Sequence, residues 1–149
     1  MLENNIGLLI YGDTGNGKTH AAACIANALI DECVPVMMTS FPRILSGGFD
    51  KSSTIAEMNR YPLVVIDDLG AERQSDYSLE IMYLIIDERY KAKKPLIITT
   101  NLSFNRWNEI FGDEVLTAAM VDRITCKAYV MNITGQSYRI KETKEWLES

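Results

Sequence analysis

The chain has 149 residues, a net charge of −5 and 47% hydrophobic residues, which is typical of one globular domain with a substantial core. No apolar run approaches the length of a membrane span, the first residues lack the features of a signal peptide, and the acidic composition limits any contact with nucleic acid to a local patch. Three separated cysteines (Cys24, Cys33 and Cys126) and a single histidine argue against a zinc site or a disulfide framework and indicate a reducing cytoplasm.

Apolar runs bounded by turn residues predict strands, and the periodic segments between them predict helices. In chain order we expect strand 6–12, helix 17–33, strands 35–40 and 62–70, helix 77–93, strand 95–101, helices 103–111 and 115–126, and strand 128–134. Several of the strand runs lack an alternation of apolar and polar residues, as expected of strands covered on both faces. The sequence therefore predicts an α/β domain with a parallel sheet between helices.

Two segments allow more than one interpretation. Residues 41–60 form the least regular part of the chain, and SGGFDKSS within them predicts a loop tip. The predicted helix 77–93 carries two apolar stripes, Leu79, Met82, Tyr83, Ile86 and Tyr90 in one and Ile81, Leu84 and Ile85 in the other. We favour a helix with a wide face toward the core, and the alternative is that one stripe contacts a neighbouring subunit.

A glycine-rich turn joins the first strand to the first helix within LLIYGDTGNGKTHAAACIANALI, and residues 12–19 match the Walker A pattern G-x-x-x-x-G-K-[ST]. Such a loop aims several backbone N–H groups at a phosphate, and the following helix adds its free amides and the positive end of its dipole. Lys18 can reach the β- and γ-phosphates, and Thr19 can bind Mg²⁺. The predicted nucleotide-binding residues are Gly12, Asp13, Thr14, Gly15, Asn16, Gly17, Lys18 and Thr19, together with His20, which we expect on the helix surface and not as a catalyst.

The apolar strand LVVIDD ends in Asp67 and Asp68. Two carboxylates at the end of a buried strand are costly unless a ligand uses them. Downstream of a Walker A motif they indicate a Walker B element, in which Asp67 binds Mg²⁺ beside Thr19 and Asp68 orients or deprotonates the attacking water. Because many ATPases have the longer glutamate at the second position, Asp68 predicts slow hydrolysis. The alternative is a strand that simply runs into a polar loop.

Another predicted strand, PLIITTN, ends in Thr99, Thr100 and Asn101. If it lies beside the Walker B strand, it places an amide near the γ-phosphate and the attacking water, but the sequence alone does not give that adjacency. Arg123 in MVDRI and Arg139 in GQSYRI are ambiguous by periodicity, because an arginine on a helix face is often only solvated.

Walker A, LVVIDDLGAE, TTN, VDRI and SYRIK occur in this order, and together they resemble the AAA+ ATPases of the DnaC/DnaI helicase-loader and IstB transposition-helper clade over nearly the whole chain. The resemblance implies a three-layer P-loop NTPase with a five-stranded parallel sheet, in which the strand ending at Asn101 lies between the two Walker strands. It implies that Asn101 is a sensor of the γ-phosphate, that Arg123 is an arginine finger acting on ATP held by a neighbouring protomer, and that Arg139 is a second sensor. A guanidinium at this place stabilises the charge that develops in phosphoryl transfer, so hydrolysis would depend on assembly.

The sequence also departs from this clade in three respects. We expect no N-terminal helicase-binding domain in the 149 residues, a short connection between the second strand and the Walker B strand, and a helical lid that is absent or truncated, because little follows residue 140. Residues 1–149 are predicted to form a single ATPase core domain, with the possibility left open that it belongs to a longer protein.

The leading interpretation is a cytoplasmic DNA replication protein that binds and hydrolyses ATP with Mg²⁺. It would load a replicative helicase and assemble with further copies of itself on single-stranded DNA. A transposition helper shares every motif, and two alternatives come from other classes: a small-molecule kinase, and an interaction module that binds nucleotide without turnover. An aromatic ring with basic neighbours suits single-stranded DNA, and in the irregular segment such residues are Arg43, Phe49, Lys51 and Arg60. The alternative, which the acidic composition favours residue by residue, is a solvated surface loop.

Overall fold

A computed structural model gives the fold of the protein and describes residues 5–12, 17–46, 51–70, 76–102, 106–107, 112–126 and 128–133. The strands in these ranges are β1 (Gly7–Gly12), β2 (Val36–Ser40), β3 (Leu63–Leu69), β4 (Leu96–Thr100) and β5 (Ala128–Ile133). The helices are α1 (Lys18–Asp31), α2 (Phe41–Ser46), α3 (Lys51–Met58), α4 (Asp76–Lys91) and α6 (Glu114–Thr125). None of the helices in the described ranges combines the length and the apolar character that crossing a membrane requires.

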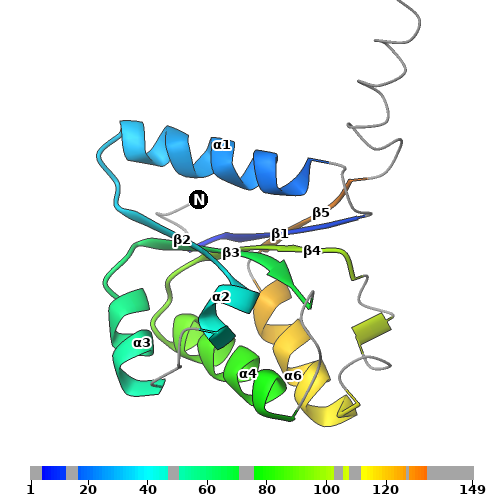
Figure 1. Cartoon of the computed structure of the whole chain (residues 1–149). Coiled ribbons are helices and arrows are strands. Elements are labelled where there is room, and N and C mark those ends of the chain that lie inside the picture. The colour runs from blue at the N-terminus through cyan, green and yellow to red at the C-terminus, as the bar shows by residue number, and fades with distance from the viewer. Residues whose placement is uncertain are drawn as a thin grey trace, which may run out of the picture.

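The strands form one five-stranded parallel sheet in the order β2-β3-β4-β1-β5. Figure 1 shows α1 on one face of the sheet and α2, α3, α4 and α6 on the other, which makes three layers. The predicted α/β fold with a five-stranded parallel sheet is therefore confirmed, and β4 lies between β3 and β1 as the resemblance implied. Each predicted strand agrees with the observed one to within one residue at either end.

The central strands are apolar up to their polar carboxyl ends because helices cover both faces of the sheet. Side chains of alternate strand residues point to opposite faces, so Leu9 and Ile66 join the core on the side of α4, while Ile10 and Val65 join the core on the side of α1. Helix α1 contributes Ala22 and Ala26 to this second core, and both are buried. Small side chains at these positions let α1 lie close to the sheet.

Helix α4 buries residues of both of its apolar stripes in the core beneath the sheet. Leu79, Met82 and Ile86 come from one stripe, Ile81 and Ile85 come from the other, and all five are buried. The helix also contacts α3 and α6. The preferred interpretation of segment 77–93, a helix with a wide face toward the core, is confirmed.

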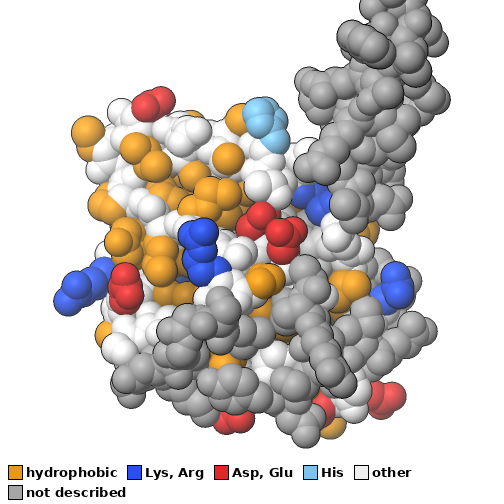
Figure 2. Space-filling model, in the orientation of Figure 1, with side chains coloured by type: hydrophobic (Ala, Val, Ile, Leu, Met, Phe, Trp, Pro, Cys, Tyr) orange, Lys and Arg blue, Asp and Glu red, His pale blue; other side chains and the backbone are white. Residues whose placement is uncertain are grey.

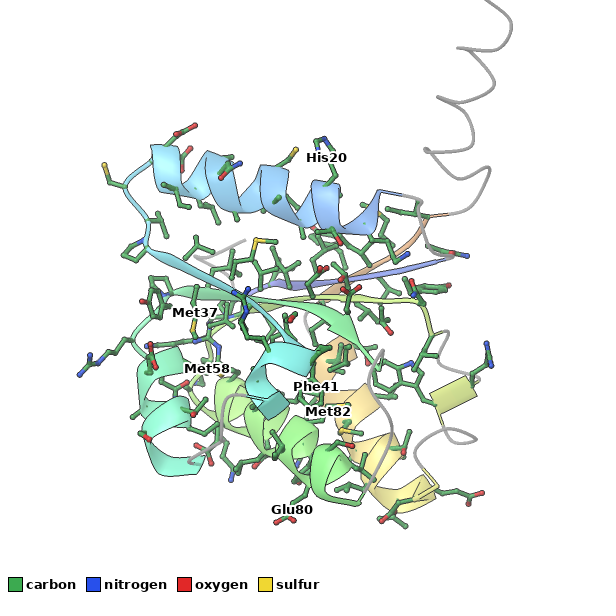
Figure 3. The ribbon with its side chains drawn as sticks, viewed as in Figure 1. His20, Met37, Phe41, Met58, Glu80 and Met82 are labelled. Carbon is green, nitrogen blue, oxygen red and sulfur yellow. The ribbon has the colours of Figure 1, made fainter. Side chains whose placement is uncertain are left out.

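The prediction that residues 41–60 are irregular is wrong, because most of this segment forms α2 and α3. Ser40 caps α2, since its Oγ accepts a hydrogen bond from the backbone N–H of Arg43 at 3.3 Å. Phe41 and Met58 are buried at 0% and 1% exposure, and Figure 3 shows them on α2 and α3 in the layer below the sheet, together with Met82 of α4. Burial in the core beneath the sheet thus stabilises these two short helices, since helices of this length are marginal on their own. The predicted loop tip falls partly on residues 47–50, which lie outside the described residues.

The structure describes little of the predicted helix 103–111, and it does not test the predicted lack of a lid. Within 103–111 it describes residues 106–107, which are helical, and it does not describe the segment after 133. Trp107 is fully buried, and its indole N–H donates to the backbone oxygen of Leu102 at 3.3 Å. This contact anchors the chain just after β4 on the core.

A buried arginine joins the elements at the start of the central strands. Arg89 of α4 is 1% exposed and donates from Nη1 to the backbone oxygens of Met58 and Tyr61, at 2.9 Å each. Its Nη2 donates to the backbone oxygens of Pro95 at 2.8 Å and Pro62 at 3.4 Å. Burial lowers the pKa of Arg89 to about 10. These carbonyls belong to residues that precede β3 and β4. Arg89 therefore fixes the two segments that lead into these strands against the end of α4.

Replacing Arg89 with methionine should strongly destabilise the fold, because four carbonyl oxygens would lose a donor that is itself buried. We expect the free energy of unfolding to fall by about 3 kcal/mol or more, measured by urea denaturation. Arg60→Met, at an exposed arginine in the same region, is the matched control and should change stability by less than about 0.5 kcal/mol. Equal effects of the two substitutions would show that the carbonyl contacts of Arg89 contribute little.

Candidate functional site

Two glycines of the predicted phosphate loop, Gly12 and Gly17, lie at positions that suit glycine. A Cβ on Gly12, at the end of β1, would lie 2.2 Å from the backbone oxygen of Ile133. Gly17 caps α1 with a φ of 84°, in the left-handed region that favours glycine. Lys18 follows as the first residue of α1 and is 6% exposed. The start of α1 therefore has the backbone amides of a helix N-terminus and the buried lysine that a phosphate site needs, while residues 13–16 of the predicted loop lie outside the described residues.

The carboxylate of Asp67 connects three elements at the carboxyl edge of the sheet. Thr19 of α1 donates its hydroxyl to Asp67, at 3.0 Å from Oδ1 and 3.1 Å from Oδ2. Thr99 of β4 also donates its hydroxyl to Asp67 Oδ1. The structure thus places the two residues predicted to bind Mg²⁺, Thr19 and Asp67, in direct contact. In an open parallel sheet this edge is where ligands usually bind.

The neighbouring residue, Asp68, projects from an irregularity in strand β3. Ile66 pairs with Ile98 and Leu69 with Thr100, so two residues of β3 lie opposite the single Thr99 of β4. Asp68 takes a left-handed φ of 56°, which aspartate tolerates better than most residues. Its backbone N–H donates to Thr99 Oγ1 at 3.0 Å. One threonine side chain therefore holds both the carboxylate of Asp67 and the backbone of Asp68.

The two carboxylates differ in their electrostatic environment. Partial burial raises the pKa of Asp68, the charge of Asp67 raises it further, and the charge of Lys18 partly offsets both effects. A raised pKa suits a group that accepts a proton during a reaction. Figure 2 shows acidic side chains near the middle of the face seen in Figure 1, below α1 and open to solvent. Asp68 is exposed, so it can meet a water molecule or a bound ligand.

The donor set at this edge fits a magnesium nucleotide. Mg²⁺ prefers oxygen ligands and usually takes only one or two from the protein, while phosphates and water supply the rest. The hydroxyl of Thr19 and the carboxylate of Asp67 are such ligands. Among the described residues, no group of three or more His, Cys, Asp or Glu side chains could hold a metal ion.

The remaining predicted residues do not all gather at this edge. Asn101 directly follows β4, is exposed, and so lies near Thr99 along the chain. His20 is exposed on α1, where Figure 3 shows it pointing away from the sheet, and its Nε2 lies 3.6 Å from Cys24 Sγ. Arg139 lies outside the described residues. The roles assigned to these residues stay predictions.

Arg123 lies at the opposite edge of the sheet. It lines a cavity of about 400 Å³ whose wall includes Gly7 and Leu8 at the start of β1 and Leu96 at the start of β4. Since β4 runs four residue steps from Leu96 to Thr100, the two edges are about 13 Å apart along this strand. The structure therefore separates Arg123 from Thr19 and Asp67 of the same chain.

Two features of these sites were not predicted from the sequence. The sequence shows Thr99 only as a polar residue near the end of an apolar strand, because its bonds to both aspartates depend on the register of β3 and β4. Asp87, which binds Arg123, is a residue that the motifs do not indicate. Asp87 lies four residues from both Tyr83 and Lys91, which places the three side chains along one face of α4. This spacing is the feature of the sequence from which such a group could have been predicted.

Thr99→Val keeps the shape of the side chain and removes its hydroxyl. The change leaves Asp67 with one fewer donor and the N–H of Asp68 without an acceptor, so we expect the free energy of unfolding to fall by about 1–3 kcal/mol. It should also weaken Mg²⁺-dependent binding of ATP by about 10-fold, as loss of a group that orients a metal ligand usually does. A fluorescent ATP analogue, titrated with and without Mg²⁺, measures the second effect.

The control for this prediction is Thr125→Val, which makes the same change on α6. There the hydroxyl donates to the backbone oxygen of Val121 at 2.7 Å, away from Asp67 and Asp68. If both variants bind the nucleotide equally well, Thr99 does not support the site.

Comparisons with known proteins identify the family of the chain. A family model described as IstB-like ATP binding protein matches residues 1–146. The putative ATP-binding protein of insertion sequence IS232 from Bacillus thuringiensis subsp. berliner is 31% identical over 147 residues, which cover 95% of this chain and 58% of that protein. The replicative helicase loader DnaC of Escherichia coli strain K12 is 25% identical over 150 residues, covering 91% of this chain and 61% of that protein. The chain thus spans about three fifths of the length of these two relatives.

Comparison with solved structures identifies the fold. The crystal structure of DnaI superposes with a TM-score of 0.76 at 26% identity, and the match covers 89% of this chain and 72% of DnaI. This likeness confirms the predicted three-layer P-loop NTPase fold of the AAA+ type. The sequence relatives include an insertion-sequence protein as well as a helicase loader. They therefore support both branches of the predicted clade equally, the helicase loaders and the transposition helpers.

Proposed function

The chain belongs to the family of IstB-like ATP-binding proteins, and from this premise we propose that it is an ATP-hydrolysing switch that assembles with further copies of itself when ATP is bound. The observation that carries the proposal is the contact of Asp67 with Thr19 and Thr99. It brings the hydroxyl and the carboxylate that Mg²⁺ needs to within hydrogen-bonding distance, beside the free amides at the start of α1. This arrangement suits a triphosphate bound across the carboxyl edge of the sheet.

In this proposal each residue at the edge has a separate task. Lys18 and the amides at the start of α1 hold the β- and γ-phosphates, and Thr19 and Asp67 would hold Mg²⁺, whose charge offsets that of the phosphates. Asp68 accepts the proton of the attacking water, a task that its raised pKa favours. Asn101 orients the water or the γ-phosphate. Thr99 keeps both aspartates in place through its hydroxyl.

The arginine finger of this switch comes from a neighbouring copy. Arg123 cannot serve its own chain, because it lies beside the beginnings of β1 and β4 and the phosphate site lies beside the ends of β3 and β4. A second copy that stacks head to tail brings its Arg123 to the first copy's phosphate edge. Such contacts between different surfaces are heterologous, so they extend to a ring or to a filament. Hydrolysis then occurs only after assembly.

Two inactive variants should restore each other's activity if Arg123 acts between copies. Lys18→Ala cannot hold ATP but keeps Arg123, and Arg123→Ala holds ATP but lacks the finger. Each variant alone should release phosphate at least about 100-fold more slowly than the unchanged protein, since arginine fingers contribute about 10³-fold or more. A mixture should regain part of the rate, and Arg123→Ala should bind ATP with nearly unchanged affinity.

The measurement is phosphate release at several protein concentrations, without any acceptor substrate. Normal turnover by Arg123→Ala at high concentration would disprove action between copies. ATP consumption that requires a small-molecule acceptor would favour a kinase. Tight ATP binding with no phosphate release under any condition would favour an interaction module, the third function that the sequence allows.

We propose that the switch acts on a DNA-processing enzyme and assembles on single-stranded DNA. Two partner classes are supported: a replicative helicase by the similarity to DnaC and DnaI, and a transposase by the family model and the insertion-sequence relative. For the DNA itself, Arg43 and Arg60 are exposed around α2 and α3, whereas the side chains of Phe49 and Lys51 are not described.

A binding assay separates the two partner classes. The ATP-loaded protein should retain one of two purified partners, the replicative helicase or the transposase of the source organism, and should release it with ADP. Retention of the helicase alone identifies a loader, and retention of the transposase alone identifies a transposition helper. If neither is retained in any nucleotide state, the proposed link to DNA-processing enzymes is wrong.

A further inference from the structure

Arg123 is held on several sides by a compact group of side chains on α4. Its Nε donates to Asp87 Oδ1 at 2.7 Å, and its guanidinium carbon lies 5.4 Å from the ring centre of Tyr83 and 5.8 Å from that of Tyr90. Its Nη1 donates to the backbone oxygen of Ala119 at 3.2 Å, one turn earlier on α6. These contacts limit the rotation of a side chain that is otherwise among the most flexible in proteins.

Asp87 lies at the centre of this group. Its side chain is 9% exposed, whereas that of Arg123 is 25% exposed, so the acid is buried beneath the arginine. Lys91 binds its other oxygen, Oδ2, at 2.9 Å. Burial alone would raise the pKa of Asp87, but the hydrogen bonds from Lys91 and Arg123 outweigh it and hold the pKa below its usual value. Asp87 is therefore a fixed negative charge near neutral pH.

The surroundings of Arg123 are rich in positive charge. The cavity that Arg123 lines also carries four other cationic residues, Arg89, Lys91, Lys93 and Lys94. The carboxylate of Asp87 offsets part of this charge, because both Lys91 and Arg123 bind it. Among the described residues, Asp87 is the acid that forms an ion pair with Arg123. The Nη2 group has no hydrogen-bond partner within this part of the chain, so one end of the guanidinium is left to contact another molecule.

We propose that Asp87 is the positioning residue of the arginine finger: through Nε it fixes the direction in which Arg123 presents its outer N–H groups to the phosphates of a neighbouring copy. This inference rests on the proposed function and adds a residue to it. A positioned guanidinium meets the phosphate in one geometry, whereas a free one must be ordered during the reaction. Misplacement of a catalytic group by about 1 Å can cost 100-fold in rate, so loss of Asp87 should lower kcat by about 10- to 100-fold.

The mixing of two variants allows Asp87 to be tested in each role separately. In a mixture of Lys18→Ala and Arg123→Ala, the first variant only donates the finger and the second only supplies the ATP site. Asp87→Asn, which keeps the shape and removes the charge, is introduced either into the donor or into the acceptor. We expect kcat to fall by about 10-fold or more when the donor carries it, with KM for ATP unchanged, and to change little when the acceptor carries it. A general effect on folding would act on both copies.

Two further variants sharpen the test. Asp122→Asn in the donor removes an exposed acid next to Arg123 in the sequence and should leave the rate unchanged. Asp87→Glu keeps the charge, so it preserves the ion pairs even if Asp87→Asn does not fold, but it shifts the guanidinium by the length of one methylene group. A donor with Asp87→Glu should give a kcat between those of the unchanged donor and the Asp87→Asn donor.

The outcomes separate this inference from the function on which it rests. If the mixture of Lys18→Ala and Arg123→Ala releases no phosphate, action between copies is disproved, and the role of Asp87 is disproved with it. If the mixture is active and the Asp87→Asn donor works as well as its parent, only the role of Asp87 is disproved. A faster Asp87→Asn donor would also overturn it, because the carboxylate would then restrain Arg123 and not position it.

Discussion

The carboxylate of Asp67 is the contact on which the phosphate edge of this molecule depends. It accepts hydrogen bonds from Thr19 on α1 and from Thr99 on β4, and these residues lie 48 and 32 positions away in the chain. A charged group at the end of a buried strand needs such donors, because an unpaired carboxylate there would be costly. A hydroxyl has one proton to donate and lone pairs to offer. When a cation binds at this place, Thr19 can turn its proton away and use its oxygen as a ligand, so the same pair serves the empty and the loaded site.

The parallel sheet separates the molecule into two chemically different edges. Asp67 and Asp68 lie at its carboxyl edge, whereas the wall of the cavity beside Arg123 at its amino edge includes three lysines and two arginines. A bound triphosphate would make the first edge more negative, so attraction between the two edges of different copies would grow when ATP binds. The two arginines at the amino edge have different tasks. Arg89 donates hydrogen bonds to four backbone carbonyls of its own chain. Arg123 is held by one carboxylate, and part of its guanidinium stays accessible.

Local patterns predicted most of this architecture, and long-range contacts account for what they missed. The apolar strands, the glycine-rich turn and the paired aspartates are contiguous in the sequence, so their order and bounds could be predicted directly. Helices α2 and α3 were missed because their stability comes from burying Phe41 and Met58 against the sheet, which no local pattern reports. The bonds of Thr99, Arg89 and Asp87 join segments between 6 and 36 residues apart. Their partners follow from strand register and helix packing, and these exist only once the fold is known.

The irregularity in β3 changes how the short side chain of Asp68 should be judged. Compared with glutamate, aspartate places its carboxylate one methylene nearer to the backbone, which suggests a base that is too far from the attacking water. Here, however, two residues of β3 lie opposite Thr99, and Asp68 takes a left-handed backbone conformation that Thr99 holds through a 3.0 Å hydrogen bond. The backbone from which the carboxylate projects is therefore displaced from that of a regular strand. Such a conformation costs about 1 kcal/mol and persists only where the surrounding contacts enforce it. If Asp68 acts as the proposed base, its reach is set jointly by side-chain length and strand register, so the identity of residue 68 alone would not determine the rate of the proposed hydrolysis.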